Sequence, residues 1–148
     1  MADAPISLTR ADDGRGLSYL ESLLEENDLP SRDVRSKPEC FYVGYADEDP
    51  IGVGGIERDG SDGLLRSVVV ERSVRGTGYG TALCDALEAE ARGDGVEALY
   101  LLTMTAVEFF VARSYREIDR DDAPEAIRET TEFAELCPST ATCMRKSL

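Results

Sequence analysis

The sequence predicts an α/β protein of the α+β type, with a mixed, mostly antiparallel sheet of about seven strands and flanking helices. Short turns join strand-like segments in the first half, which is typical of an antiparallel meander. Strand-like and helix-like segments alternate in the second half, after a glycine-rich turn. The chain has 148 residues, so we expect residues 1–148 to form a single domain with one core.

The N-terminal part predicts one short strand and one helix. Ile6–Thr9 alternates between polar and apolar residues as a strand does. Gly16–Asn27 is predicted to be a helix. Its leucines recur at helical spacing, at Leu17, Leu20, Leu23 and Leu24. Leu29–Pro38 is polar and contains prolines, which indicates a loop that either only connects elements or contributes to the rim of a substrate site.

Three strands follow with short turns between them. Cys40–Tyr45 is rich in aromatic residues, Ile51–Arg58 comes next, and Leu64–Val70 is the most strand-like segment of the chain. The turns between them are Asp47–Pro50 and Asp59–Gly63, both rich in turn-forming residues. These segments predict the antiparallel part of the sheet.

Helical spacing returns after Arg75. Leu83, Leu87 and Ala91 lie on one face of a predicted helix that Gly93 terminates. The remaining predicted elements are the strand Val96–Thr103, the helix Thr105–Ser114, the strand Tyr115–Asp119, the helix Pro124–Glu135 and the strand Ala141–Lys146.

The charge of the chain is strongly acidic. It has 30 acidic and 16 basic residues, a net charge of −14, which disfavours binding to nucleic acid. The acidic residues are spread along the chain, so they predict a strongly solvated surface such as a halophilic source would require. No stretch approaches the roughly 18 consecutive apolar residues of a membrane span, and Met1–Pro5 lacks the features of a signal peptide. We therefore expect a cytoplasmic protein that does not bind membranes.

The chain contains four cysteines and no histidine. Cys40, Cys84, Cys137 and Cys143 show no CxxC spacing, so we expect packed thiols and no metal site. The absence of histidine excludes Ser-His-Asp and Cys-His mechanisms. A general base would have to be a carboxylate, a tyrosine, a thiolate, a terminus or water.

The glycine-rich segment Arg75–Gly80 has the properties of a phosphate-binding loop. Glycines allow close approach of the backbone, and the following helix contributes partial positive charge at its N-terminus. Arg75 adds a fixed cation. The glycines at 76, 78 and 80 do not have the spacing of a dinucleotide-binding fold, and no Gly-Lys-Ser/Thr sequence of a P-loop follows.

Arg75, Gly78 and Gly80 form R-x-x-G-x-G, which resembles the acetyl-CoA motif of the GNAT acyltransferase superfamily. Leu64–Val70 stands where that family has its central strand. The resemblance implies acetyl-CoA as co-substrate and a sheet whose strands at Leu64–Val70 and Val96–Thr103 splay apart. In that family the strand backbone pairs with pantetheine and the loop amides hold the pyrophosphate. The cofactor-binding residues implied here are Val68, Val69, Val70, Arg75, Gly76, Thr77, Gly78, Tyr79, Gly80 and Thr81.

The sequence departs from the family at the residue that often protonates the leaving thiolate. Many members carry A-x-x-F-Y-x-x-x-G-F, and here the corresponding segment is Ala106–Tyr115. Phe110 occupies the tyrosine position and has no proton to donate. Tyr115 occupies the phenylalanine position, which normally faces the core. A thiol with a pKa near about 8.5 leaves tolerably as a thiolate, so a general acid is not essential.

Further segments resemble the arsenic-resistance branch of the superfamily, whose members acetylate amino-acid-like arsenicals such as arsinothricin. They are Gly55–Glu57, Leu64–Ser67, Leu101–Ala106 with Phe109–Phe110, and Thr131–Ser139. This resemblance implies a small, amino-acid-like amine as the acceptor.

Five residues are candidates for the acceptor site. Glu57 is the candidate general base, with an exposed strand-end carboxylate as the alternative. Arg66 would bind an acceptor carboxylate, or it is a solvent-facing strand residue. Phe110, Cys137 and Ser139 are candidates for lining the substrate mouth. Cys137 would be a soft ligand for arsenic or a packed cysteine.

Two functions remain open at this point. The first is acetyl transfer from acetyl-CoA to the amine of a small molecule, with a peptide N-terminus, a polyamine or an aminoglycoside as alternative acceptors. The second is a binding module that senses acyl-CoA without catalysis. The sequence leaves the oligomeric state open, a homodimer included.

Overall fold

The structure is a computed structural model that describes residues 6–11, 14–29, 31–76, 78–136 and 140–148. Its contacts divide the chain into two compact units. Unit 1 comprises Met1–Ile56 and Ser67–Glu90, and unit 2 comprises Glu57–Arg66 and Ala91–Leu148. That residues 1–148 form a single domain stays a prediction.

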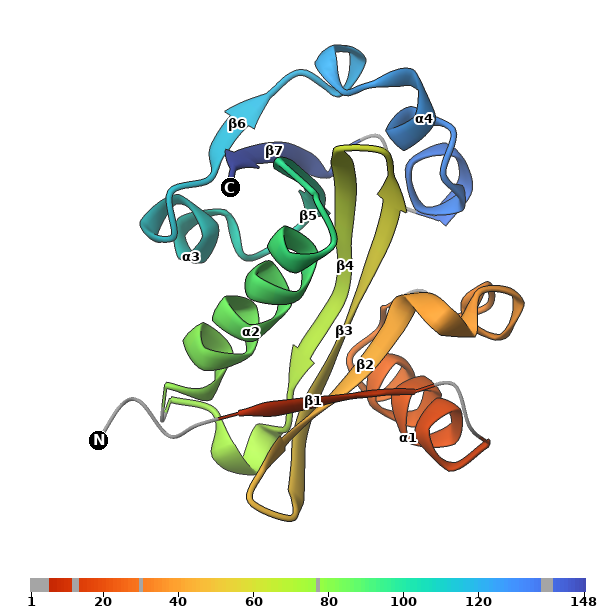
Figure 1. Cartoon of the computed structure of the whole chain (residues 1–148), viewed down its shortest axis with the longest axis vertical. Helices are drawn as coiled ribbons and strands as arrows, with labels where there is room; N and C mark the ends of the chain where they lie inside the picture. Colours follow the sequence, from red (N-terminus) through yellow and green to blue (C-terminus); the bar gives the residue numbers. More distant parts are fainter. Residues whose placement is uncertain (1–5, 12–13, 30, 77, 137–139) are drawn as a thin grey trace. The chain divides into compact units, whose positions relative to one another are not determined.

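In the described ranges the chain forms seven strands and four α-helices, which Figure 1 labels. The strands are β1 Ser7–Arg10, β2 Phe41–Ala46, β3 Asp49–Asp59, β4 Asp62–Val70, β5 Ala98–Thr103, β6 Arg116–Ile118 and β7 Thr142–Ser147. The α-helices are α1 Gly14–Glu26, α2 Tyr79–Gly93, α3 Val107–Ala112 and α4 Glu125–Arg128. Short 3-10 helices are η1 Val34–Ser36, η2 Pro38–Cys40, η3 Arg72–Val74 and η4 Arg120–Asp122, and η5 Glu132–Leu136 is a π-helix.

The strands form a sheet in the order β1-β2-β3-β4-β5-β7-β6. The pairs β1–β2, β2–β3, β5–β7 and β6–β7 are antiparallel, and β4–β5 is parallel. Only Gly60 and Ser61 separate β3 from β4, so these neighbours form a hairpin. The predicted mixed, mostly antiparallel sheet of seven strands is therefore confirmed.

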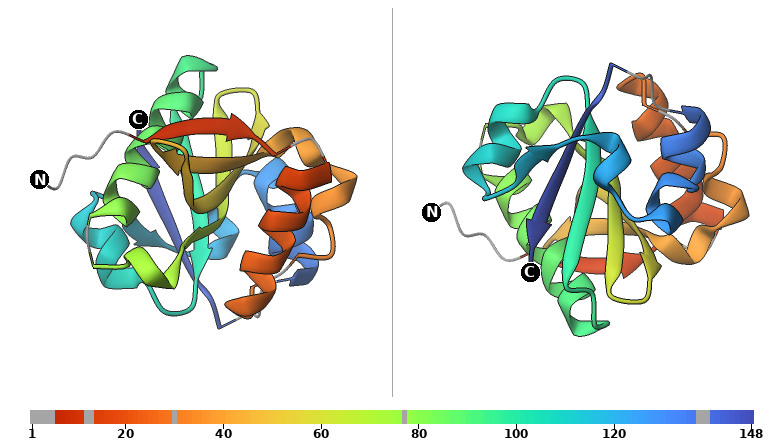
Figure 2. Two further views of the ribbon diagram at one scale, coloured as in Figure 1. Left: turned by 90° about the horizontal axis from the view of Figure 1, so that it is seen from below. Right: turned by 90° about the horizontal axis from the view of Figure 1, so that it is seen from above.

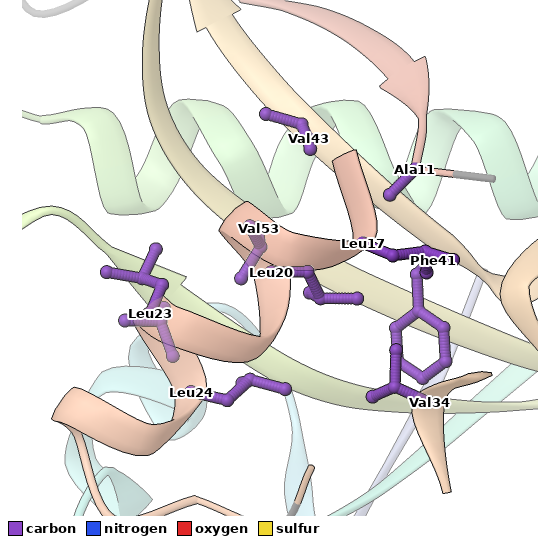
Figure 3. Packing of buried hydrophobic residues seen from close by; sticks show 10 residues of the cluster. Ala11, Leu17, Leu20, Leu23, Leu24, Val34, Phe41, Val43 and Val53 are labelled. Carbon is purple, nitrogen blue, oxygen red and sulfur yellow. The ribbon is translucent and has the colours of Figure 1, made fainter. Parts of the chain in front are cut away.

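In unit 1, α1 covers one face of β2 and β3. Its buried residues recur at three- and four-residue spacing, as an amphipathic helix requires, and each buried leucine stabilises the fold by about 1.5–3 kcal/mol. Figure 3 shows these leucines packed against residues of the strands. The cluster consists of Ala11, Leu17, Leu20, Leu23, Leu24, Val34, Phe41, Val43, Val53 and Val69.

The opposite face of the same strands carries Gly44, Gly52 and Gly54, and α2 lies against these glycines. Successive strand residues point to opposite faces, so Val43 and Val53 face α1 while Gly44, Gly52 and Gly54 face α2. A Cβ atom at Gly44 would lie 2.9 Å from Leu83 Cδ1, and one at Gly54 would lie 2.5 Å from Leu87 Cδ1. The glycines thus allow α2 to pack directly against the strand backbone. This packing fixes the position of the N-terminus of α2 relative to β2 and β3.

In unit 2, β7 lies between β5 and β6 (Figure 2). A second apolar cluster belongs to this unit. This cluster contains Leu64, Ala98, Tyr100, Ala123, Ile127, Phe133 and Cys143. Cys84 in unit 1 and Cys143 here are buried, which confirms the packing role predicted for these two thiols. Cys137 lies outside the described residues.

Two predicted helices differ from those observed. The predicted helix Pro124–Glu135 is wrong as one element, because α4 ends at Arg128 and the π-helix η5 begins at Glu132. Thr130 Oγ1 donates a hydrogen bond of 2.6 Å to the Ile127 carbonyl, and a side chain bonded to the backbone in this way competes with helix continuation. The predicted helix Thr105–Ser114 is shorter, since Ser114 adopts a φ of 77°.

None of the helices in the described part of the chain combines the length and the apolar character of a membrane span.

Replacing Gly54 with Ala should lower the free energy of unfolding by about 1–3 kcal/mol, because the added methyl group would overlap the fully buried Leu87. Denaturant unfolding measures this change. Gly93→Ala is the matched control: Gly93 ends α2 with open space around it, so the substitution should leave stability unchanged or raise it by up to about 1 kcal/mol. Equal stability of Gly54→Ala and the native protein would contradict the close contact of α2 with the strands.

Burial raises the pKa of the Cys143 thiol to about 11, an effect that nearby Arg120 only partly offsets. In the unfolded chain the thiol ionises near about 8.5. The folded state therefore holds this proton more tightly, and the stability due to Cys143 is fully present below about pH 8.5 and is lost as the pH rises towards 11. Urea unfolding between pH 8 and pH 11 should show a steeper loss for the native protein than for Cys143→Ala. Parallel curves would contradict the burial of the thiol.

Candidate active site

The glycine-rich loop of unit 1 connects the end of β4 to the start of α2. The turn η3 follows β4, and the loop then passes through Gly76 and Gly78. Both have positive φ, 80° and 91°, a region that favours glycine over other residues. Helix α2 begins at Tyr79, so the N–H groups of its first turn and its positive dipole end lie at the loop. This local geometry suits a phosphate group.

Arg75 is fixed at the base of this loop by two neutral partners. Its Nε donates to the carbonyl oxygen of Val70, 2.9 Å away, and its Nη2 donates to Asn27 Oδ1 at 2.7 Å. Asn27 is itself oriented, because its Nδ2 donates to the Leu23 carbonyl at 2.8 Å. The guanidinium is therefore held between the end of β4 and the end of α1, with its position set by both elements.

A second contact joins the end of β4 to α1. The Tyr19 hydroxyl donates to Glu71 Oε2 at 2.6 Å, and Glu71 directly follows β4. Burial and this carboxylate both raise the pKa of Tyr19 well above its ordinary value, so the phenol stays protonated and remains a donor. The Glu71 amide donates to the Ile51 carbonyl at 2.8 Å. These bonds fix the chain just before the loop.

The first three residues of β4 pair with β5. Its parallel register with β5 comprises Asp62↔Ala98, Gly63↔Leu99 and Leu64↔Tyr100, and both strands continue past it. Among these described residues the register ends at that third pair. Ser67 then adopts a φ of 58°, which interrupts the regular strand before the three valines.

In unit 2, Arg66 of β4 lies between two carboxylates. Its Nη1 donates to Glu57 Oε2 of β3 at 2.9 Å, and its Nε lies 3.5 Å from Glu132 Oε1 of η5. The Arg66 side chain is completely buried, and those of Glu57 and Glu132 are 13% and 6% exposed. A buried charge is tolerated when it is paired in this way. We call these three residues the Arg66 cluster.

The structure thus brings two predicted acceptor-site residues, Glu57 and Arg66, into direct contact. The alternative interpretation of Arg66 as a solvent-facing residue is wrong, because the residue is only 2% exposed. The alternative of an exposed strand-end carboxylate does not fit Glu57 either, since most of its side chain is covered. Their roles toward an acceptor stay predictions.

Phe110 lies in α3 and is 8% exposed. Its ring makes edge-to-face contacts with Phe109 and Tyr115, with centroids 5.1 and 5.3 Å apart. Tyr115 is buried, as its alignment with a core-facing position predicts. Phe110 therefore packs within unit 2, and its contact with an acceptor stays a prediction. Thr77, Cys137 and Ser139 lie outside the described residues.

Sequence reasoning missed Asn27 and Glu132. Asn27 is the last residue of the predicted helix Gly16–Asn27, where its side chain indicates only a helix end. Glu132 belongs to the segment Thr131–Ser139, which resembles the arsenic-resistance branch. That resemblance includes the residue but does not predict its ion pair with Arg66. No group of three or more Cys, Asp or Glu side chains suited to hold a metal occurs in the described ranges.

The model of the acetyltransferase (GNAT) family matches residues 9–117. N-acetylglutamate synthase from Neisseria gonorrhoeae, complexed with coenzyme A and N-acetyl-glutamate, has a TM-score of 0.79 at 21% identity, over 97% of this chain and 35% of that one. The chain therefore spans about a third of that synthase's length.

Two further solved structures match over nearly their whole length. Rv2747 from Mycobacterium tuberculosis, in complex with CoA and NLQ, has a TM-score of 0.77 at 19% identity, over 96% of this chain and 99% of that one. An acetyltransferase of the GNAT family from Staphylococcus aureus Mu50 has a TM-score of 0.71 at 19% identity, over 97% and 99%. At these identities the similarity shows a shared fold.

Replacing Arg66 with Met should lower the free energy of unfolding by about 3–5 kcal/mol, because Glu57 and Glu132 would stay buried without this cation. Denaturant unfolding measures the loss. In the triple variant Arg66→Met, Glu57→Gln, Glu132→Gln, most of it should be recovered, since the two carboxylates are also neutralised. A triple variant as unstable as the single one would show that the cost comes from packing instead of charge.

Proposed function

Because the family match covers most of its length, the chain belongs to the acetyltransferase (GNAT) family, and we propose that it moves the acetyl group of acetyl-CoA to the primary amine of a small, amino-acid-like acceptor. The observation that carries the proposal is the loop at Gly76 and Gly78, fixed by Arg75 at the start of α2. This arrangement suits the pyrophosphate of a CoA thioester.

The cofactor would be held by unit 1. We assign the pyrophosphate to the loop amides between Gly76 and Thr81, with Arg75 beside it, and the pantetheine arm to the backbone of Val68–Val70. The β4–β5 register, which ends at Leu64, supports this assignment, because the later residues of β4 lie beyond it. The solved structures of N-acetylglutamate synthase and Rv2747 contain CoA on the same fold.

The acceptor would be recognised by the Arg66 cluster. An acceptor that carries a carboxylate beside its amine offers Arg66 a planar, bidentate partner. The N-acetyl-glutamate in the Neisseria synthase is the N-acetylated form of a compound of this class, which supports an amino-acid-like acceptor. Within that class we propose glutamate-like compounds, including the arsenicals that the sequence resemblance implies.

The chemistry requires one proton acceptor. We propose that the Glu57 carboxylate takes a proton from the acceptor ammonium, directly or through water. The amine lone pair then attacks the thioester carbonyl carbon, the C–N bond forms, and the C–S bond breaks with CoA leaving as thiolate. The attacking nitrogen loses its second proton as the amide forms, and this proton passes through water to the thiolate, since Phe110 stands at the position where many family members carry a tyrosine.

A second candidate function is a non-catalytic module that binds acyl-CoA. Phe110 favours it, because the residue removes the usual proton donor. The two candidates share the cofactor loop and differ only in turnover, so one experiment separates them.

The experiment measures CoA binding by calorimetry and thiol release from acetyl-CoA with an acceptor panel. The panel contains L-glutamate, its arsonic and phosphinic analogues, spermidine, an aminoglycoside and a short peptide. We expect thiol release with the glutamate-like compounds, and a loss of about 10²–10⁴-fold in kcat for Glu57→Gln with CoA affinity unchanged. CoA binding without thiol release for any acceptor would overturn the catalytic proposal in favour of the binding module.

The cofactor assignment has its own matched control. Arg75→Gln should weaken CoA binding about tenfold, because it removes the fixed cation at the loop. Arg72 is also exposed and lies three residues earlier, with its Nη2 on the Glu26 carbonyl at 3.3 Å. Arg72→Gln should leave the affinity within about twofold, since Arg72 begins η3 and the rest of that turn lies between it and the glycines. Equal effects of the two substitutions would overturn the role of Arg75.

A further inference from the structure

Unit 1 contains a cavity of about 440 Å³ that is partly open to solvent. It lies between the first half of α1, the strands β1 and β2, and the turn that leads into β3. Pockets that hold small molecules measure roughly 300–1,000 Å³. All of the described residues that line the cavity belong to unit 1, and none of them belongs to the loop Arg75–Gly80 or to the Arg66 cluster. The cavity is therefore separate from the residues assigned to the cofactor and the acceptor.

Two tyrosines form walls of this cavity. Tyr19 of α1 and Tyr45 of β2 both line it, and both are partly buried against the apolar cluster of unit 1. The two side chains lie near each other, because Tyr45 adds to the effect of burial and of the Glu71 carboxylate in raising the pKa of Tyr19. The buried Val43 extends the apolar lining. Planar apolar walls of this kind suit an aromatic ring, which gains from stacked or edge-to-face contacts with tyrosine.

Both tyrosines are held by contacts within unit 1. The Tyr19 hydroxyl donates to Glu71 Oε2 at 2.6 Å, which fixes the ring from its outer end. Tyr45 is paired in the sheet with Ser7 of β1 on one side and with Pro50 of β3 on the other. Walls that are already ordered lose little conformational entropy when a ligand binds.

The cavity also has charged residues of both signs. Arg15 of α1 and Glu48 of the β2–β3 turn line it from different elements, and both are exposed. Arg10 lines it as well, but its Nη1 donates to the Glu39 carbonyl at 2.9 Å and its guanidinium lies 5.7 Å from the centre of the Tyr42 ring. Among the described lining residues this leaves one cation and one anion for a ligand. Such a pair complements a zwitterion.

From these features we infer that the cavity is a binding site for an aromatic amino acid, additional to the sites of the cofactor and the acceptor. The ring of this ligand lies against Tyr19 and Tyr45, its carboxylate meets Arg15, and its ammonium meets Glu48. The inference goes beyond the proposed function and does not depend on it, because it concerns binding and requires no acetyl transfer.

The test uses the full chain and three probes that share a phenyl ring. L-Phenylalanine carries both charges, 3-phenylpropionate lacks the ammonium, and 2-phenylethylamine lacks the carboxylate. Affinities are measured by NMR titration of the ¹⁵N-labelled protein, which also reports on the backbone amides of Tyr19 and Tyr45. We expect saturable binding of phenylalanine below about 10 mM, with shifts of both amide signals. Each of the other two probes should bind about fivefold more weakly, because it loses one charged contact near the surface.

Two substitutions assign the charged contacts. Arg15→Gln should weaken binding of phenylalanine and phenylpropionate about fivefold and leave phenylethylamine within about twofold. Glu48→Gln should weaken phenylalanine and phenylethylamine by the same factor and leave phenylpropionate within about twofold. Asp49→Asn is the matched control for Glu48→Gln, since it removes the adjacent exposed carboxylate, which is not among the described residues that line the cavity. It should leave all three affinities unchanged.

The inference is wrong if phenylalanine shows no saturable binding below about 10 mM, or if it binds without shifting either tyrosine amide. Equal affinity of the three probes for the native protein would also overturn it, and this comparison needs no substitution. So would a loss in Glu48→Gln that Asp49→Asn reproduces. Arg15 and Glu48 are exposed, so we expect both variants to fold, and their unfolding midpoints are measured before the titrations. No thioester is present in these titrations, so their result is independent of whether the chain transfers acetyl groups.

Discussion

The close approach of β3 to the end of β4 is the constraint on which unit 1 depends. A Cβ atom at Gly52 would lie 2.5 Å from the Val69 carbonyl oxygen and 3.1 Å from Leu83 Cδ2, so only a residue without a side chain fits between them. This contact places the valines of β4, and α2 rests on the same glycine-lined face. The loop that joins β4 to α2 is therefore fixed at both ends. A loop that is already ordered loses less conformational entropy when it binds a charged group.

Strand β4 also carries two kinds of chemistry within a few residues. Arg66 is buried with two carboxylates, and the valines that follow are proposed to pair with the cofactor. Ser67 lies between them with a left-handed backbone, a conformation that costs free energy for a residue other than glycine. Such a residue interrupts the regular pleat of the strand. The alternation of side-chain directions before Ser67 therefore does not continue unchanged after it.

Much of this fold could be predicted from the sequence because its signals are local. Alternation and helical spacing indicated the strands and helices, and the glycines after Val70 indicated the loop. The break near Thr130 was missed, because one side-chain hydrogen bond outweighs helix propensity there. The pairing of Arg66 with Glu132 could not be predicted, since side chains 66 positions apart leave no periodic pattern. Asn27 was missed for the same reason: its bond to Arg75 depends on how α1 packs.

The partners of Arg75 have a consequence for how the loop responds to ionic strength. Salt weakens attraction between exposed charges, with a screening length of about 3 Å at 1 M. Arg75 is exposed, but the bonds that hold it end on a backbone carbonyl and an amide oxygen, neither of which carries a net charge. Neither of these two bonds is an ion pair that dissolved ions could screen. We therefore expect the orientation of the guanidinium to depend little on ionic strength, while its own charge toward a ligand remains subject to screening.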